Sequence, residues 1–283
     1  MNALFGAAGN SDLFYEQGHK KSEEMPKWLA EMGLDAYEYQ CGNGVRIGAA
    51  AAQAIRAQAE EYGIQLSVHS PYYINLATPD EKKRCGGIGY IMQSAEAARN
   101  LGAERIVVHS GALGKLTRPE AMEYAKKTLL LAQEELENAG FSEIRLCIET
   151  MGKINQLGDL DEVMELCKLC DKFLPTIDFG HLNARTLGTI RTKEDYAAIL
   201  DTMENALGKE RAENFHAHFS KIEYTKGGEK KHLTFADTEF GPEFEPLGEL
   251  LAERNLSPTV ICESAGTQAT DALAMKKMYL NSR

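Results

Sequence analysis

Residues 105–109 read Arg-Ile-Val-Val-His and residues 145–149 read Arg-Leu-Cys-Ile-Glu, two apolar runs that each end on a potential metal ligand. Short apolar runs bounded by turn residues are typical of buried β-strands. The same pattern recurs along the chain, with the terminal groups His69, His109, Glu149, Asp178, His216 and Glu263. The repetition predicts parallel strands whose carboxyl ends converge on one site.

The chemistry of these terminal groups indicates a metalloenzyme. Ionisable groups at the ends of buried strands need compensation, because an unpaired buried charge costs several kcal/mol. Divalent cations supply it, since histidines and carboxylates form the mixed nitrogen and oxygen donor set that suits Zn²⁺ or Mn²⁺.

Strand and helix patterns alternate through the whole chain of 283 residues. Strands are expected at residues 3–7, 36–40, 64–69, 105–109, 145–149, 174–178, 214–219 and 259–263, and helices at 22–32, 48–62, 81–101, 118–139, 160–170, 193–207, 245–254 and 267–279. This α/β alternation predicts a single-domain (β/α)8 TIM barrel over residues 1–283. A doubly wound sheet is the alternative, but its ligands gather at one switch point and would not follow strand after strand.

Composition bounds the class of protein and its partners. No apolar run approaches the roughly 18 residues of a membrane span, and the segment MNALFGAAGNSD lacks the basic leader of a signal peptide. The six cysteines form no disulfide-like framework, so we expect reduced thiols and a cytoplasmic location. We also expect a monomer. The net charge of −11 argues against strong nucleic-acid binding, although bound zinc ions would offset part of it at the site.

Several motifs, in matching order from about residue 60 onward, resemble endonuclease IV, the zinc-dependent apurinic/apyrimidinic endonuclease family of the xylose-isomerase-like TIM barrels. They are VHSPYYINLA (68–77), IVVHSG (106–111), CIETMGK (147–153), TIDFGHLNAR (176–185), the His216 strand with Ser220-Lys221, and CESAG (262–266). The resemblance implies metal-assisted hydrolysis of DNA on the 5′ side of abasic sites, as in base excision repair.

The resemblance also implies a trinuclear zinc centre. Its ligands would be His69, His109 and Glu149 for one ion, Glu149, Asp178, His216 and Glu263 for a second, and His181 for a third. Glu149 would bridge the first two ions. Glu149 and Glu263 would serve catalysis through the metals, by fixing the nucleophile.

The third zinc site departs from the family pattern, which supplies an Asp-x-His pair in the loop after strand seven. Residues 226–232 read KGGEKKH, so His232 can be the histidine, but Lys230 stands where the aspartate belongs. A charged lysine cannot bind a metal, and Glu229 would have to substitute with altered spacing. We therefore expect two zinc ions and leave the third open.

Candidate substrate-binding residues are Tyr72, Arg46, Lys221 and His218. Tyr72 matches a family position that enters the duplex beside a flipped lesion. Arg46 lies in the loop 42–48, which can hold a phosphate at a helix N-terminus but has no bulky residue to serve as a wedge. Lys221 would stabilise a leaving oxygen, and His218 lies on the same strand face as His216.

Two other functions stay open. A sugar isomerase or epimerase of the same superfamily would use one metal and move a proton on a small sugar with Glu149 and Glu263. The acidic charge and the missing wedge favour that enzyme, whereas the matches at His69, His109 and His181 favour the nuclease. The third class is a non-catalytic, metal-dependent binding protein. The long segment 221–244 predicts a lid or binding loop.

Overall fold

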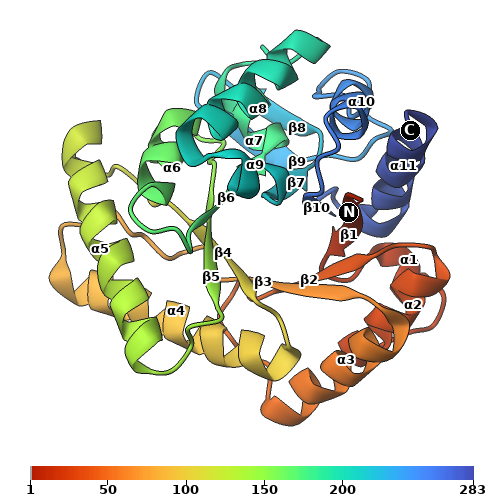
Figure 1. Cartoon of the computed structure of the whole chain (residues 1–283), viewed down its shortest axis with the longest axis horizontal. Coiled ribbons are helices and arrows are strands. Elements are labelled where there is room, and N and C mark those ends of the chain that lie inside the picture. The colour runs from red at the N-terminus through yellow and green to blue at the C-terminus, as the bar shows by residue number, and fades with distance from the viewer. Residues whose placement is uncertain (1) are drawn as a thin grey trace.

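The computed structural model describes residues 2–283, and in them eight parallel strands close into a barrel (Figure 1). Around the ring the strands follow the order β1-β10-β7-β6-β5-β4-β3-β2, so that the first and last strands pair. Their bounds are β1 (Leu4–Ala8), β2 (Ala36–Gln40), β3 (Gln65–His69), β4 (Arg105–His109), β5 (Arg145–Glu149), β6 (Leu174–Asp178), β7 (His216–Phe219) and β10 (Thr259–Cys262). The prediction of a single-domain TIM barrel is confirmed.

The strands are apolar throughout because both of their faces are covered. Ile106, Val107 and Val108 of β4 are fully buried, as is typical of parallel strands with side chains inside and helices outside. The register then aligns the strand ends, with His109 of β4 paired to Glu149 of β5. The barrel therefore presents its terminal side chains at one mouth.

Helices surround the barrel (Figure 1). Their bounds are α1 (Asp12–Glu16), α2 (Met25–Glu31), α3 (Ala49–Tyr62), α4 (Glu81–Leu101), α5 (Arg118–Asn138), α6 (Leu160–Cys167), α7 (Phe179–Arg185), α8 (Lys193–Leu207), α9 (Lys209–Glu213), α10 (Glu245–Glu253) and α11 (Gln268–Asn281), with a 3-10 turn at Ser22–Glu24. The expected helices are all present, and α6 ends three residues early. The short helices α1, α7 and α9 were not expected, since a pattern of so few residues has no resolvable period.

The segment after β7 differs from the expected long loop. It opens with an antiparallel hairpin of β8 (Ile222–Thr225) and β9 (Gly228–His232). The turn between the strands is Lys226-Gly227, and Gly228, the first residue of β9, has a φ of +88°, the left-handed conformation that tight hairpins favour. The hairpin stands at the barrel mouth beside α7 (Figure 1).

None of the helices described between residues 2 and 283 combines the length and apolar character that a bilayer crossing requires.

Candidate metal centre

Histidines and carboxylates from several strands meet at the carboxyl end of the barrel, where we call them the mouth cluster: His69, His109, Glu149, Asp178, His181, His218, Glu229, His232 and Glu263. Most of them line a cavity of about 300 Å³. Active sites of TIM barrels form at this end, because the loops that follow the strands are there.

Glu149 lies at the centre of the mouth cluster. Its Oε2 is 3.1 Å from His109 Nε2 and 3.4 Å from His69 Nε2. Its Oε1 is 3.1 Å from His218 Nδ1 and 3.4 Å from His181 Nδ1. A carboxylate with donors on both of its oxygens has the placement that a bridging metal ligand requires.

Asp178 joins a second donor group with Glu149, His218 and Glu263. Its Oδ1 caps helix α7 by accepting the backbone N–H of His181 at 2.7 Å. Its Oδ2 is buried, lies 3.2 Å from His181 Nδ1 and has no aligned hydrogen-bond partner among residues 2–283. The sequence DFGH thus folds into a strand end and a helix start, which leaves one carboxylate oxygen directed at the cluster.

His216 is not in this second group, and the sequence-based assignment of this histidine is corrected. His216 opens β7 where the sequence suggested that it closed the strand, and it pairs with Thr176, whereas His218 pairs with Asp178. Two residues along a strand correspond to about 6.6 Å. His216 therefore lies one layer deeper in the barrel, and His218, a candidate substrate-binding residue in the sequence, lies level with Asp178 and beside Glu149.

The third donor group consists of His181, Glu229 and His232, with 3.6 Å between His181 Nε2 and Glu229 Oε2. Residues three apart on a regular strand point to opposite faces. The pairing of β8 with β9 is interrupted at Lys230, because Glu223 pairs with Lys231 and Tyr224 with Glu229. This bulge accommodates one extra residue and brings Glu229 and His232 to the same face. The lysine that disrupted the motif is the residue that the bulge absorbs.

Gly152 allows the loop after β5 to approach this third group. A Cβ at this position would lie 2.6 Å from Glu229 Cβ and 2.9 Å from His181 Cδ2, and such distances are too short for any side chain. The backbone of Gly152 also accepts the N–H of Glu229 at 3.0 Å. Glycine here lets the hairpin close against the mouth.

The donor set fits divalent metal ions of the zinc or manganese type. Glu149 Oε2, His218 Nε2 and Asp178 Oδ2 are buried without an aligned hydrogen bond to any of residues 2–283, although an ionisable group lies within 3.0–3.4 Å of each of them. Nitrogen and oxygen atoms that bind one cation point at the cation and not at one another, so they lie close together without aligned hydrogen bonds. Mixed imidazole and carboxylate donors suit Zn²⁺ and Mn²⁺.

Without a cation, protons balance the mouth cluster. Burial opposes ionisation of Glu149, but the charge of His109 and hydrogen bonds from its histidine neighbours outweigh burial and hold the pKa of Glu149 well below its ordinary value. Burial likewise opposes protonation of His69, yet contact with Glu149 raises its pKa to about 9. The charges of Asp178 and Glu263 overcome burial at His181 and His218, and raise the pKa of each histidine well above its ordinary value.

We expect metal binding to release protons. A metal binds neutral imidazole, so below pH about 9 it must displace the proton of His69. The apparent zinc affinity should therefore rise with pH and level off above about 9. Calorimetric titration at pH 7 in buffers of different ionisation enthalpy should show release of about two or three protons per protein. Binding without proton release would mean that the histidines are already neutral.

The predicted substrate-binding residues fall in different places. Tyr72 is 54% exposed and lines the cavity, with its hydroxyl donating to Asn43 Oδ1 at 2.8 Å. Arg46 is exposed on its loop and does not line the cavity. Lys221 is buried, and its Nζ donates to the Asp237 carbonyl at 2.8 Å and Glu243 Oε1 at 2.6 Å. It therefore tethers the loop after β9 and is not directed at the cavity.

The sequence did not lead us to Glu38 or Lys153, and it suggested Glu229 only as a possible substitute for the missing aspartate. Lys153 lines the cavity, directly after the Gly152 that lets the loop approach. Glu38 is fully buried inside the barrel. The sequence did contain a signal for Glu38: a charged residue in the middle of the strand 36–40, which helices cover on the outside, is rarely buried unless it is paired.

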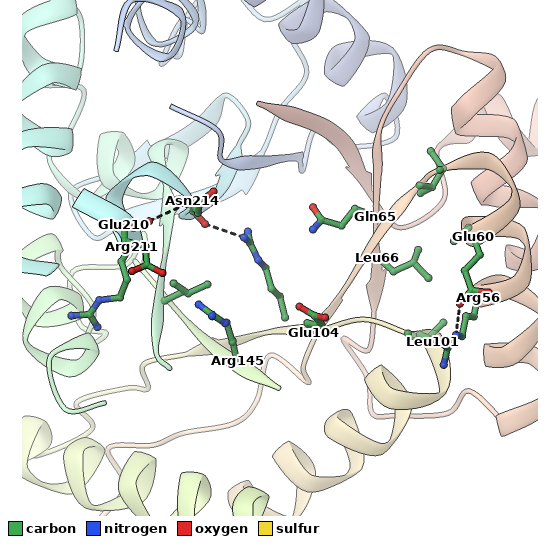
Figure 2. Close-up of a pocket in the computed structure, with 16 residues that line it drawn as sticks. Arg56, Glu60, Gln65, Leu66, Leu101, Glu104, Arg145, Glu210, Arg211 and Asn214 are labelled. Atoms are coloured by element: carbon green, nitrogen blue, oxygen red, sulfur yellow. Dashed lines mark hydrogen bonds and ion pairs between the residues drawn. The ribbon is translucent and has the colours of Figure 1, made fainter. Parts of the chain in front are cut away.

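A larger cavity, of about 630 Å³, opens at the amino-terminal end of the barrel (Figure 2). The Arg105 guanidinium donates to the carbonyls of Asn214 at 3.0 Å and Phe215 at 3.4 Å across its floor, and Arg56 is paired with Glu60 at 2.7 Å. None of the mouth-cluster residues lines this cavity. Size therefore does not identify the reactive site.

Comparison with known proteins identifies the family. Residues 26–278 match the model of the xylose isomerase-like TIM barrel. The chain belongs to this family. An uncharacterized protein of Methanocaldococcus jannaschii is 34% identical over 251 residues, which cover 89% of each chain. A probable endonuclease 4 of Mycoplasma pneumoniae is 29% identical over 159 residues, which cover 54% of this chain and 52% of that protein.

Solved structures whose names give different functions share this barrel fold. Endonuclease IV from Thermus thermophilus superposes with a TM-score of 0.71 at 19% identity, covering 99% of this chain and 100% of that one. A D-tagatose 3-epimerase-like protein superposes with a TM-score of 0.72 at 22% identity, covering 98% and 97%. The suspected resemblance to endonuclease IV is confirmed, and the shared fold does not choose between the two activities.

Proposed function

We propose that this member of the family is a zinc-dependent phosphodiester hydrolase that cleaves DNA beside abasic sites. The observation that carries the proposal is the third donor group, His181, Glu229 and His232, which adjoins the two groups around Glu149. A sugar isomerase needs one metal, whereas three adjoining donor groups suit a phosphate whose oxygens are held from several sides. The relatives named probable endonuclease 4 support the same activity.

Different residues of the mouth cluster would bind different cations. His69 and His109 would hold one cation with Glu149, and Asp178, His218 and Glu263 would hold a second with the same carboxylate. When bound, the cations would lower the pKa of a water to about 7 and neutralise charge on the phosphoryl oxygens.

Groups around the cluster would position the substrate. His232 Nδ1 lies 2.9 Å from Ser220 Oγ, which fixes its ring beside Glu229. Lys153 lines the cavity and would pair with a phosphate of the substrate. The exposed ring of Tyr72 would stack against a base next to the abasic site.

A sugar epimerase is the second candidate, because two observations favour it. The net charge is −11, and the loop 42–48 offers no wedge to a duplex. Burial raises the pKa of Glu263, so this carboxyl group could hold a proton as one member of an acid–base pair with Glu149. One metal, bound by Glu149, Asp178, His218 and Glu263, would suffice.

The deciding experiment offers zinc-loaded protein an abasic duplex, an intact duplex and a panel of ketoses and aldoses. We expect nicking 5′ to the abasic site, complete loss of it with chelator, and cleavage of intact duplex slower by about 100-fold or more, since extruding a paired base costs a few kcal/mol. Duplex binding should have a shallow salt dependence, because few Lys and Arg side chains are expected to contact phosphates. Interconversion of sugars without nicking would replace the nuclease by the epimerase.

The third metal site has its own test. Glu229→Gln should remove a third zinc equivalent and leave the other two, as measured by elemental analysis after dialysis. Deletion of Lys230 is the matched control, because it converts Glu-x-x-His into Glu-x-His, which a regular strand places on one face. The deletion should keep the third equivalent. Retention of the third equivalent in Glu229→Gln would mean that Glu229 does not bind a metal at this site.

The six cysteine thiols are unpaired, and the reducing cytoplasm is the compartment we propose.

A further inference from the structure

Below the mouth cluster, Glu38 and His216 meet His218, which belongs to the mouth cluster as well, and we call these three side chains the inner group. All three side chains are fully buried. The inner group lies in the barrel interior, and Glu38 and His216 do not line the cavity. Neither of them can contact a substrate, so their role must act through a neighbour.

Glu38 is engaged on both oxygens. Ser67 Oγ donates to Oε2 at 2.8 Å and Gln40 Nε2 donates to Oε1 at 3.1 Å. His216 Nε2 lies 2.9 Å from Oε2, and His218 Nε2 lies 3.0 Å from Oε1. A carboxylate with this many partners is fixed in orientation. Its oxygens are already occupied by donors, which argues against a further cation inside the inner group.

His218 connects the inner group to the mouth cluster. Its Nδ1 is 3.1 Å from Glu149 Oε1 and 3.5 Å from Glu263 Oε2. Its Nε2 is buried and lies 3.0 Å from Glu38 Oε1, within ion-pair distance, although no aligned hydrogen bond forms from it to any of residues 2–283. In an imidazole that binds a metal, the nitrogen that carries the proton decides which nitrogen is free to coordinate.

We infer that Glu38 is a positioning residue, whose carboxylate lies 3.0 Å from Nε2 of His218, favours the proton on that nitrogen and thereby leaves Nδ1 as the nitrogen that faces Glu149 and Glu263. The inference rests on the metal centre of the proposed function, but not on the substrate. Carboxylate partners of metal-binding histidines orient the ring and raise its basicity, and their loss costs about 10–100-fold in metal affinity.

The test is Glu38→Gln, which preserves the volume of the side chain and removes its charge. We expect zinc affinity at the site containing His218 to fall about 10–100-fold in a chelator competition, and the visible spectrum of the cobalt-substituted protein to change. Asp35→Asn is the control, because it is the same change just before β2, where the carboxylate binds Lys276 and the Phe5 N–H and no histidine. Unchanged zinc affinity and cobalt spectrum in folded Glu38→Gln would overturn the inference.

A measurement on the unaltered protein covers the case in which Glu38→Gln does not fold. In zinc-loaded protein labelled with ¹⁵N-histidine, His218 should be protonated at Nε2 and coordinated through Nδ1. Coordination through Nε2 would refute the role of Glu38. Because neither measurement uses a substrate, failure to nick abasic DNA would reject the proposed reaction and leave the test of Glu38 intact.

Discussion

Glu149→Gln is expected to weaken both metal sites of the central pair together, because each carboxylate oxygen of Glu149 contacts histidines of a different site. Removing the charge also leaves buried histidines without their counter-charge. We expect zinc affinity at both sites to fall by about 100-fold or more, since the loss of a residue that only hydrogen-bonds to a metal ligand already lowers metal affinity by about 10–100-fold. The metal-free protein should lose about 3 kcal/mol of stability or more, the cost of breaking a buried ion pair.

Elemental analysis, chelator competition and thermal unfolding measure these effects. His69→Ala is the control, because this histidine contacts only one oxygen of Glu149 and its loss should empty mainly one site. If Glu149→Gln kept two zinc ions with unaltered affinity, the bridging role of Glu149 would be wrong, and the two donor groups would be independent.

The two histidines of β7 are expected to differ sharply on replacement. His218→Ala should release one zinc equivalent and abolish hydrolysis, because His218 pairs in register with Asp178 and contacts Glu149. His216→Ala should keep both equivalents, with less than about a tenfold change in affinity. It should lower stability by about 3 kcal/mol, from the cavity and the lost hydrogen bond to Glu38.

Zinc content and unfolding curves of the two variants give the comparison directly. Loss of zinc from His216→Ala but not from His218→Ala would restore the sequence-based assignment. Equal loss from both would mean that the ring of His216 reaches the mouth, which its pairing with Thr176 contradicts.

The sequence by itself determined the barrel and most of its mouth. Strands and helices alternate with distinct hydrophobic periods, and parallel strands end at one side of a sheet, so His69, His109, Glu149 and Asp178 could be placed together before any coordinates were known. These residues end their strands in the structure as well. Local pattern suffices there because each of them is the last residue of an apolar run.

Tertiary structure decided the rest. FHAHFSK carries two histidines on one strand face, and only the pairing of β7 with β6 shows that His218 is level with Asp178. Glu229 and His232 share a face only through the bulge at Lys230, which depends on the partner strand. The role of Glu38 can be inferred only from its contacts with His216 and His218, and His216 is 178 residues away along the chain. Register, bulges and contacts between distant strands are properties of chain pairing, and a single strand's sequence does not encode its neighbour's offset.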